Sequence, residues 1–100
     1  MGDIKNKYIE KVRRLVLEHF ADTPAEVYLF GSWARGAQRH GSDVDIAIDC
    51  ADTRTGQKIA VLRELLEEST IPYRVDVVDM RHAAESLREE IRREGVRWKQ

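Results

Sequence analysis

Two aspartates separated by one valine, Asp43 and Asp45, are the residues of this sequence best suited to chemistry. Residues 43–49 alternate between polar and apolar, which predicts a β-strand. Two carboxylates on one face of a strand lie roughly 6–7 Å apart, where they repel and raise each other's pKa. A divalent cation such as Mg²⁺ removes this repulsion, because it binds carboxylate oxygens together with phosphates and water. The alternative is that the pair lies on a solvated edge strand and binds nothing.

The alternation also assigns the two faces of this strand. The residues expected in the core are Val44, Ile46 and Ile48, and those expected on the other face are Asp43, Asp45, Ala47 and Asp49. We expect the second face to be solvated or to hold a cation. Asp49 shares this face with Asp45 but lies roughly 13 Å further along the strand, so we leave it out of the site.

A second candidate feature is the dipeptide Gly31-Ser32, which follows the apolar run Val27 to Phe30, predicted to be a buried strand. Residues 33–35, which come next, can begin a helix. Glycine lets the backbone approach a phosphate closely, and the N–H groups at a helix start favour anions. The Ser32 hydroxyl adds a further hydrogen-bond donor. By itself, however, a Gly-Ser dipeptide is typical of an ordinary turn.

Three helices and a third strand must position these residues. Apolar spacings of three and four predict a first helix over residues 4–20, with Ile4, Tyr8, Val12, Leu15, Val16, His19 and Phe20 inward. A second helix follows Gly56, with Ile59, Leu62, Leu65 and Leu66 inward and Thr53 or Thr55 as a possible N-cap. Residues 74–79 predict the third strand, and a last helix presents Ala84, Leu87 and Ile91 before Gly95 ends it. This order predicts one α/β domain over residues 1–100.

Composition excludes several classes of protein. Lys and Arg number 17 and Asp and Glu 18, interleaved along the chain, which argues against a long polynucleotide as the main partner. The single cysteine, Cys50, cannot form an intramolecular disulfide and is expected to be a small buried hydrophobe. No apolar run approaches the ~20 residues of a membrane-spanning helix, and no apolar signal segment begins the sequence. We therefore expect no membrane association and a cytoplasmic location.

Taken together, Gly31-Ser32, ten intervening residues and Asp43-Val44-Asp45 resemble the signature of the polymerase-beta-like nucleotidyltransferase superfamily. By size the chain is most similar to the minimal nucleotidyltransferases (MNT proteins), which often accompany an all-helical HEPN partner as an antitoxin. The resemblance implies their α+β fold, a small mixed β-sheet packed with helices.

The resemblance also implies a third carboxylate on a later strand, for which Asp76 is the matching candidate. Asp79 is its rival, but three residues along a strand place it on the opposite face, and it is better explained as the N-cap of the last helix. Asp43, Asp45 and Asp76 are then expected to bind two Mg²⁺ ions about 3.5–4 Å apart, which clamp the attacking and leaving oxygens. Asp76 also helps to deprotonate the acceptor hydroxyl.

The nucleotide is assigned in the same way. Gly31 and Ser32 are expected to hold the triphosphate of ATP, and Arg35 either neutralises charge on the leaving group or is simply solvated. Trp33 either stacks on a nucleobase or packs its short helix against the sheet. His40, in the neighbouring loop, is a weaker candidate for substrate contact, and Trp98 lies in a tail that packs back or meets a partner.

The implied function is Mg²⁺-dependent transfer of a nucleoside monophosphate, AMP from ATP, to a hydroxyl of a HEPN-type toxin, which makes the chain an antitoxin that inactivates by modification. A second hypothesis is a non-catalytic antitoxin that neutralises its partner by forming a complex. A third is a modifier of small molecules, such as an aminoglycoside nucleotidyltransferase, which would need a dimer or a partner to complete its pocket. Homo- or hetero-oligomers are compatible with each hypothesis.

Overall fold

A computed structural model of the chain describes residues 6–37 and 42–99, except for the side chain of residue 99. Its elements run in the order α1 (Lys7–His19), β1 (Glu26–Phe30), α2 (Gly31–Arg35), β2 (Val44–Asp49), α3 (Thr55–Glu68), β3 (Val75–Asp79), η1 (Met80–His82, a 3₁₀ turn), α4 (Glu85–Glu94) and β4 (Val96–Lys99). Ile4 and His40 lie outside the described residues.

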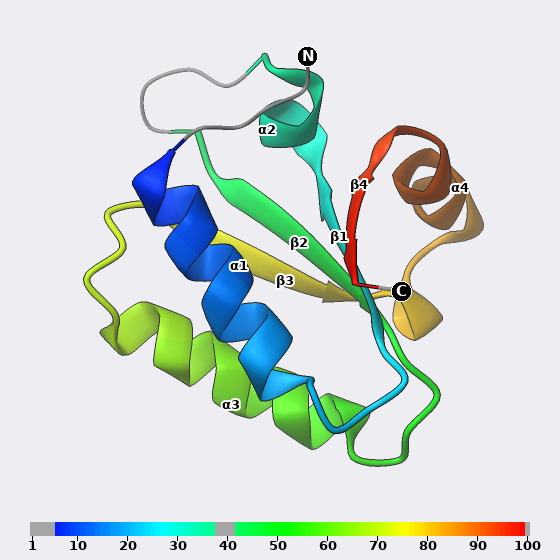
Figure 1. The fold of residues 1–100 in the computed structure, drawn as a ribbon. Helices are drawn as coiled ribbons and strands as arrows, with labels where there is room; N and C mark the ends of the chain where they lie inside the picture. Colours follow the sequence, from blue (N-terminus) through cyan, green and yellow to red (C-terminus); the bar gives the residue numbers. More distant parts are fainter. Residues whose placement is uncertain (1–5, 38–41, 100) are drawn as a thin grey trace.

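The four strands form one mixed sheet in the order β3-β2-β1-β4. β1 is antiparallel to both of its neighbours, whereas β2 and β3 are parallel. As Figure 1 shows, α1 and α3 lie side by side on one face of the sheet, while α4 lies beside β4 and β1 on the other side. The expected small mixed sheet packed with helices is confirmed.

The main core lies between the sheet and the pair α1 and α3. From α1 it takes Ile9, Val12 and Val16, with Phe20 directly after the helix, and from β2 it takes the three residues expected there, Val44, Ile46 and Ile48. The helix begins at Asn6, whose side-chain oxygen accepts hydrogen bonds from the N–H groups of Tyr8 and Ile9 at 2.8 and 3.3 Å.

The periodicity was misleading at a few positions of the two long helices. Ile9 is fully buried although it was not expected inward, whereas Tyr8 and Leu15 are only half-buried. In α3, Leu65 is 41% exposed, because the helix meets the sheet along the narrower stripe of Ile59, Leu62 and Leu66. For a hydrophobic residue at the border of such a stripe, burial depends on which neighbouring element packs there, and the periodicity does not determine it.

The expected helix caps were also partly wrong. α3 has Arg54 at its N-cap position and no side-chain cap, because the Thr55 hydroxyl donates backwards to the carbonyls of Cys50 and Asp52 at 3.2 and 2.6 Å. Asp79 does cap a helical turn, but this turn is η1, where its carboxylate accepts from the Arg81 N–H at 3.0 Å. Cys50 is buried in the core, as expected.

The second face of the sheet is not solvated along its whole length, which corrects the expectation for Ala47. This residue is buried in a small cluster with Tyr28, Met80 and Ile91, where η1 and α4 cover the sheet. The alternation correctly placed Ala47 on the face of Asp45, but it carries no information on which element packs there. Asp45 near one end of β2 and Asp49 at the other both remain half-exposed.

The tail of the sequence forms a strand that was not expected, β4. It pairs with β1 through Val96 and Arg97, and Trp98 packs partly buried against the main core. Gly95 ends α4, as expected, and its N–H donates to the Ile91 carbonyl at 2.8 Å. None of the described helices is long and apolar enough to cross a membrane.

We predict that Gly95→Ala lowers the free energy of unfolding by about 1–3 kcal/mol, because overpacking at a tight contact costs this much. A Cβ there would lie 2.5 Å from the Ile91 carbonyl oxygen and 3.4 Å from that of Leu29. The control is Gly56→Ala in α3, where a Cβ meets nothing within 4 Å, so helix propensity should raise stability by up to ~1 kcal/mol. Urea unfolding checks both, and equal stability of the two variants would contradict the packing described for the turn into β4.

Candidate functional site

Strand pairing brings Asp45 and Asp76 side by side. They are register partners in the parallel pair of β2 and β3, and their side chains lie on the same face of the sheet. The antiparallel neighbour β1 ends at Phe30, the register partner of Asp45. The residue after it, Gly31, therefore lies beside the same carboxylate. The adjacency expected from the Gly-Ser and Asp-x-Asp spacing is present in the fold.

Gly31 is required at this position for two reasons. Its φ of 74° lies in the left-handed region that favours glycine. A Cβ built on it would also overlap the Oδ2 atom of Asp45, well inside van der Waals contact. The backbone of the turn between β1 and α2 is thus packed directly against the Asp45 carboxylate, and half-buried Ser32 follows it.

Two further carboxylates, those of Asp43 and Asp76, lie near Asp45 and influence its ionisation. Burial raises the pKa of Asp45 above its ordinary value, and the carboxylates of Asp76 and Asp43 raise it further, whereas Arg35 lowers it. Asp43 is exposed just before β2. Asp76 is half-exposed and its Oδ1 lies 3.6 Å from the Arg74 Nε. Charge repulsion at Asp45 is the situation that a bound cation relieves, so these residues fit a Mg²⁺ site.

The carboxylates have not converged on a shared point. Among the residues that the structure describes, no three Asp, Glu, His or Cys side chains already form a metal-binding group. Asp43 and Asp76 are exposed enough to change rotamer, and Asp45 is the one member held by packing.

Arg35 lies near the carboxylates and is not simply solvated. It is about half exposed, its Nη1 lies 3.9 Å from a Glu94 carboxylate oxygen, and its charge lowers the pKa of Asp45. An exposed ion pair of this length contributes little to stability. Arg35 can therefore exchange Glu94 for an anionic ligand at small cost.

Trp33 packs and does not present its ring to a ligand. It is 5% exposed, it contacts Tyr73 edge to face with centroids 5.1 Å apart, and its Nε1 donates to the Ser42 carbonyl at 3.3 Å. The Tyr73 hydroxyl oxygen in turn accepts from Asn6 Nδ2 at 3.2 Å. These contacts tie the segments that precede β2 and β3 to each other and to α1. Periodicity gave no signal for Tyr73 or Asn6, since both lie outside regular elements.

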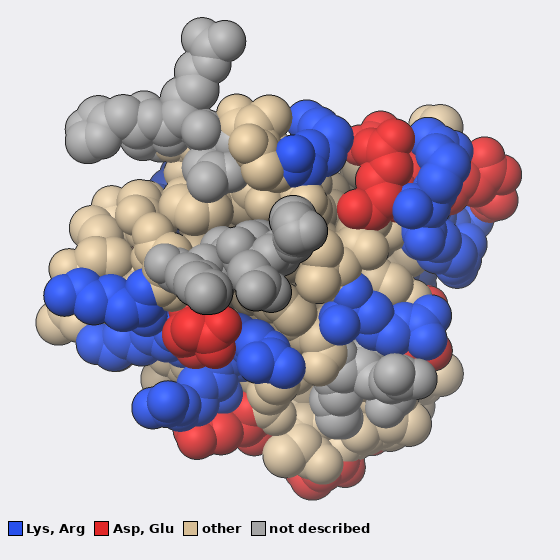
Figure 2. All heavy atoms as spheres, turned by 45° about the horizontal axis from the view of Figure 1, so that its top comes forward, with Lys and Arg blue, Asp and Glu red and all other residues tan. Residues whose placement is uncertain are grey.

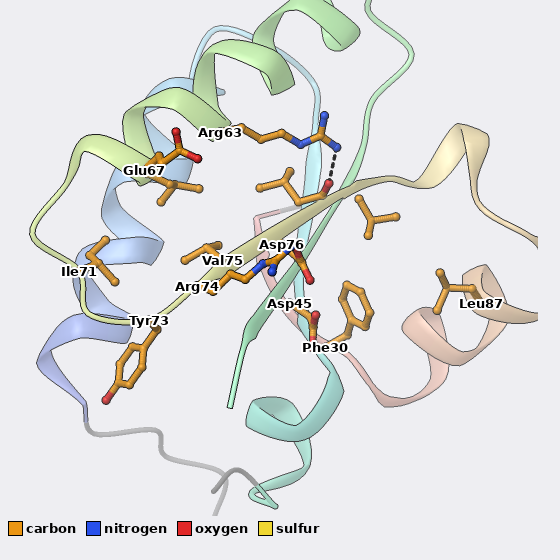
Figure 3. Close-up of a pocket in the computed structure, with 13 residues that line it drawn as sticks. Phe30, Asp45, Arg63, Glu67, Ile71, Tyr73, Arg74, Val75, Asp76 and Leu87 are labelled. Atoms are coloured by element: carbon orange, nitrogen blue, oxygen red, sulfur yellow. Dashed lines mark hydrogen bonds and ion pairs between the residues drawn. The ribbon is translucent and has the colours of Figure 1, made fainter. Parts of the chain in front are cut away.

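Asp45 and Asp76 open into a hollow of about 890 Å³. Figure 3 shows their carboxylates close together next to Phe30, in the middle of the lining residues, with Arg63 and Glu67 of α3 on the far side of β3. The sequence did not identify the other residues that line this hollow, which include Phe30, Arg63, Glu67, Tyr73, Arg74 and Leu87. These six come from four separate parts of the chain and share no motif.

The two excluded aspartates lie away from this hollow. Asp49 occupies the opposite end of β2, with its Oδ2 4.0 Å from Arg92 Nη2, and Asp79 is paired with Ile48 at the far end of β3. Both exclusions agree with the geometry. Acidic and basic side chains alternate over the surface shown in Figure 2, with no continuous basic stripe on the face in view.

The chain is similar to known proteins in both sequence and fold. A family model described as "Polymerase beta, Nucleotidyltransferase" matches residues 10–98. Protein adenylyltransferase MntA of Shewanella oneidensis is 38% identical over 69 residues, which are 69% of this chain and 49% of that protein. The chain thus spans about half the length of that relative. Probable protein adenylyltransferase MntA of Haemophilus influenzae is 32% identical over 91 residues, 91% of this chain and 78% of that protein.

Solved structures agree with these matches. A proposed minimal nucleotidyltransferase superposes with a TM-score of 0.73 at 36% identity, covering 90% of this chain and 92% of that one. The MNT antitoxin solved in complex with a tri-AMPylated Shewanella oneidensis HEPN toxin gives a TM-score of 0.65 at 27% identity, covering 92% and 69% of the two chains. The resemblance inferred from the Gly-Ser and Asp-x-Asp residues is confirmed.

We predict that Asp45→Asn raises the free energy of unfolding near neutral pH in metal-free buffer. The folded-state pKa of Asp45 is raised, so its ionised form costs stability, and this cost grows as pH rises from the ordinary carboxyl pKa through the raised one. The gain should therefore shrink as pH falls towards the ordinary value. Thermal unfolding across pH checks it, with Asp49→Asn as the control, since Asp49 faces Arg92. A gain independent of pH would contradict this explanation.

We predict a second effect at Trp33. Trp33→Phe keeps an aromatic ring but removes the N–H that holds the Ser42 carbonyl, so it should lower stability by about 1–3 kcal/mol. Tyr8→Phe is the control, because it removes a hydroxyl from the same aromatic group and leaves the contact to Ser42 intact. Equal stability of both variants would show that the Ser42 contact is unimportant.

Proposed function

Since the chain belongs to the polymerase beta nucleotidyltransferase family, we propose that it transfers AMP from ATP to a hydroxyl group of a HEPN-type protein and thereby acts as an antitoxin. The observation that carries this proposal is the alignment of Asp45 with Asp76 directly beside Gly31. The choice of AMP and of a HEPN-type acceptor is supported by the two adenylyltransferases and the AMPylated toxin complex that the chain resembles.

Asp43, Asp45 and Asp76 are the residues that would hold Mg²⁺, in our proposal two ions. When bound, Mg²⁺ supplies positive charge against the phosphates and lowers the pKa of an acceptor hydroxyl. The chain contributes the arrangement, because the pairing of β2 with β3 fixes the backbone positions of Asp45 and Asp76 next to each other. The side chains of Asp43 and Asp76 are exposed enough to rotate towards a metal ion.

The turn after β1 would bind the triphosphate. Gly31 has no side chain between the backbone and Asp45, so phosphate oxygens can approach the N–H groups at the start of α2, where no side chain caps the helix. The Ser32 hydroxyl adds a donor. Arg35, one turn further on, would leave Glu94 and pair with the departing pyrophosphate.

The reaction follows from these positions. The acceptor oxygen attacks the α-phosphorus of ATP, a new P–O bond forms, and the bond to the bridging oxygen of the pyrophosphate breaks. Asp76, the half-exposed carboxylate at the edge of the group, takes the proton of the hydroxyl. Asp45, which is packed against Gly31, keeps its position throughout.

A second candidate function is neutralisation by binding alone. The observation in its favour is the outer face of α3, where Val61 and Leu65 are each 41% exposed one helical turn apart. An apolar pair of this kind is suited to a helical partner. Neutralisation would then survive loss of the aspartates and fail when this pair is made polar.

The test is transfer of label from α-³²P-ATP in Mg²⁺ buffer to the Shewanella oneidensis HEPN toxin. Asp43→Ala/Asp45→Ala should reduce labelling by more than about 100-fold, since it removes two proposed metal ligands. The matched control is Asp49→Ala, which removes a carboxylate from the same strand outside the site and should label normally. Equal labelling by wild type and the double variant would refute the proposal. Unlabelled but fully neutralised toxin would support binding alone.

A further inference from the structure

β3 is the edge strand of the sheet on the side of the carboxylates. It is last in the order β3-β2-β1-β4, and within residues 6–37 and 42–99 no strand pairs with its outer side. A free strand edge presents a row of main-chain donors and acceptors. The groups of that row can be identified from two hydrogen bonds.

The Val44 N–H donates to the Arg74 carbonyl at 2.9 Å, so the main-chain groups of Arg74 point towards β2. Successive residues of a strand point in opposite directions, which places the groups of Asp76 and Val78 towards β2 as well. Those of Val75 and Val77 point outwards. The second bond agrees with this parity, because the outward Val77 carbonyl accepts from Arg63 Nη2 at 2.7 Å.

This edge lies at the bottom of a continuous groove between α3 and α4. The hollow that contains Asp45 and Asp76 shares Arg63, Val77, Val78 and Leu87 with a second hollow of about 460 Å³ further along β3. Figure 3 shows Arg63 extending from α3 to β3, where it bonds to the Val77 carbonyl, and Leu87 on α4 on the other side of the strand. The groove therefore runs along the strand edge and passes the carboxylates, since Tyr73 and Val75 line it beyond Asp76.

Only an extended polypeptide matches this row of groups at strand spacing. The N–H and carbonyl of Val75 and the N–H of Val77 are available on the outer side, while Arg63 covers the Val77 carbonyl and reduces self-pairing. An added strand also places one of its side chains next to Asp76 on the same face, about 5 Å from it. Asp45, Asp76 and that side chain would then form one row across three strands.

We propose that the outer edge of β3 binds an extended segment of the acceptor protein as an added strand, with the acceptor hydroxyl on the residue opposite Asp76. The inference rests on the proposed function, because it specifies how the acceptor of that reaction is held. It requires a non-helical segment, a terminus or a loop, in the acceptor.

Amide hydrogen exchange measured by NMR tests the proposal within a single strand. The Asp76 and Val78 amides, which bond to β2, serve as internal controls and should exchange slowly in the free chain. The Val75 and Val77 amides should exchange fast in the free chain and be slowed at least about tenfold by the Shewanella oneidensis HEPN toxin. Unchanged exchange of Val75 and Val77 in a complex that transfers label would overturn the inference and leave the proposed function standing.

A variant adds a kinetic test. Val75→Pro removes an outward N–H without removing a bond to β2, which is the position where strands accept proline. It should raise KM for the toxin about three- to tenfold and leave Mg·ATP binding unchanged, and unchanged KM in a folded variant would count against the added strand. Protection of Val75 and Val77 without toxin, together with a dimeric mass in solution, would instead assign the edge to a second copy of this chain. No labelling by wild type would overturn the proposed function and this inference together.

Discussion

The half-buried position of Asp45, beside the carboxylates of Asp76 and Asp43, is the constraint on which this end of the sheet depends. Asp45 cannot move away from its neighbours, because β2 is fixed between β1 and β3 and Gly31 is packed against its carboxylate. Folding alone does not favour this arrangement, since both burial and the nearby charges oppose ionisation of Asp45. The two hydrophobic clusters on either face of the sheet offset this cost. The unfavourable electrostatic environment is that of Asp45, near one end of β2.

The features of the fold that depend on local sequence pattern, such as which residues share a strand face, could be predicted. Strand alternation correctly placed Val44, Ile46 and Ile48 in the core, and the parity of Asp76 and Asp79 separated the two rival aspartates. β4 was not predicted, because residues 96–99 alternate between apolar and charged over only four positions, the shortest run that indicates a strand, and the pairing depends on the edge that β1 offers. For the same reason, the pattern gave the face of Ala47 but not its burial.

Part of the candidate site could also be predicted. Gly31 and Asp45 meet because β1 ends where the antiparallel strand β2 begins, and the sequence spacing indicates this contact. The residues that line the rest of the hollow are far apart in sequence. Arg63 and Leu87 reach the hollow from helices far apart in the chain, and Tyr73 supports Trp33 from an irregular segment. Such residues are identified only once tertiary packing is known.

Because Trp33 is buried next to Ser42, its intrinsic fluorescence can report on changes at this end of the sheet. The chain has two tryptophans. Trp33 bonds to the Ser42 carbonyl just before β2, and Trp98 lies on β4, the edge strand opposite β3. The two indoles therefore lie on different elements, α2 and β4, although both contact the main core. With Trp98 replaced by phenylalanine, intrinsic fluorescence would arise from Trp33 alone, and its emission would follow any displacement of Ser42 and the adjacent Asp43 in real time. A ligand that rearranges this end of the molecule could be followed without a chemical label.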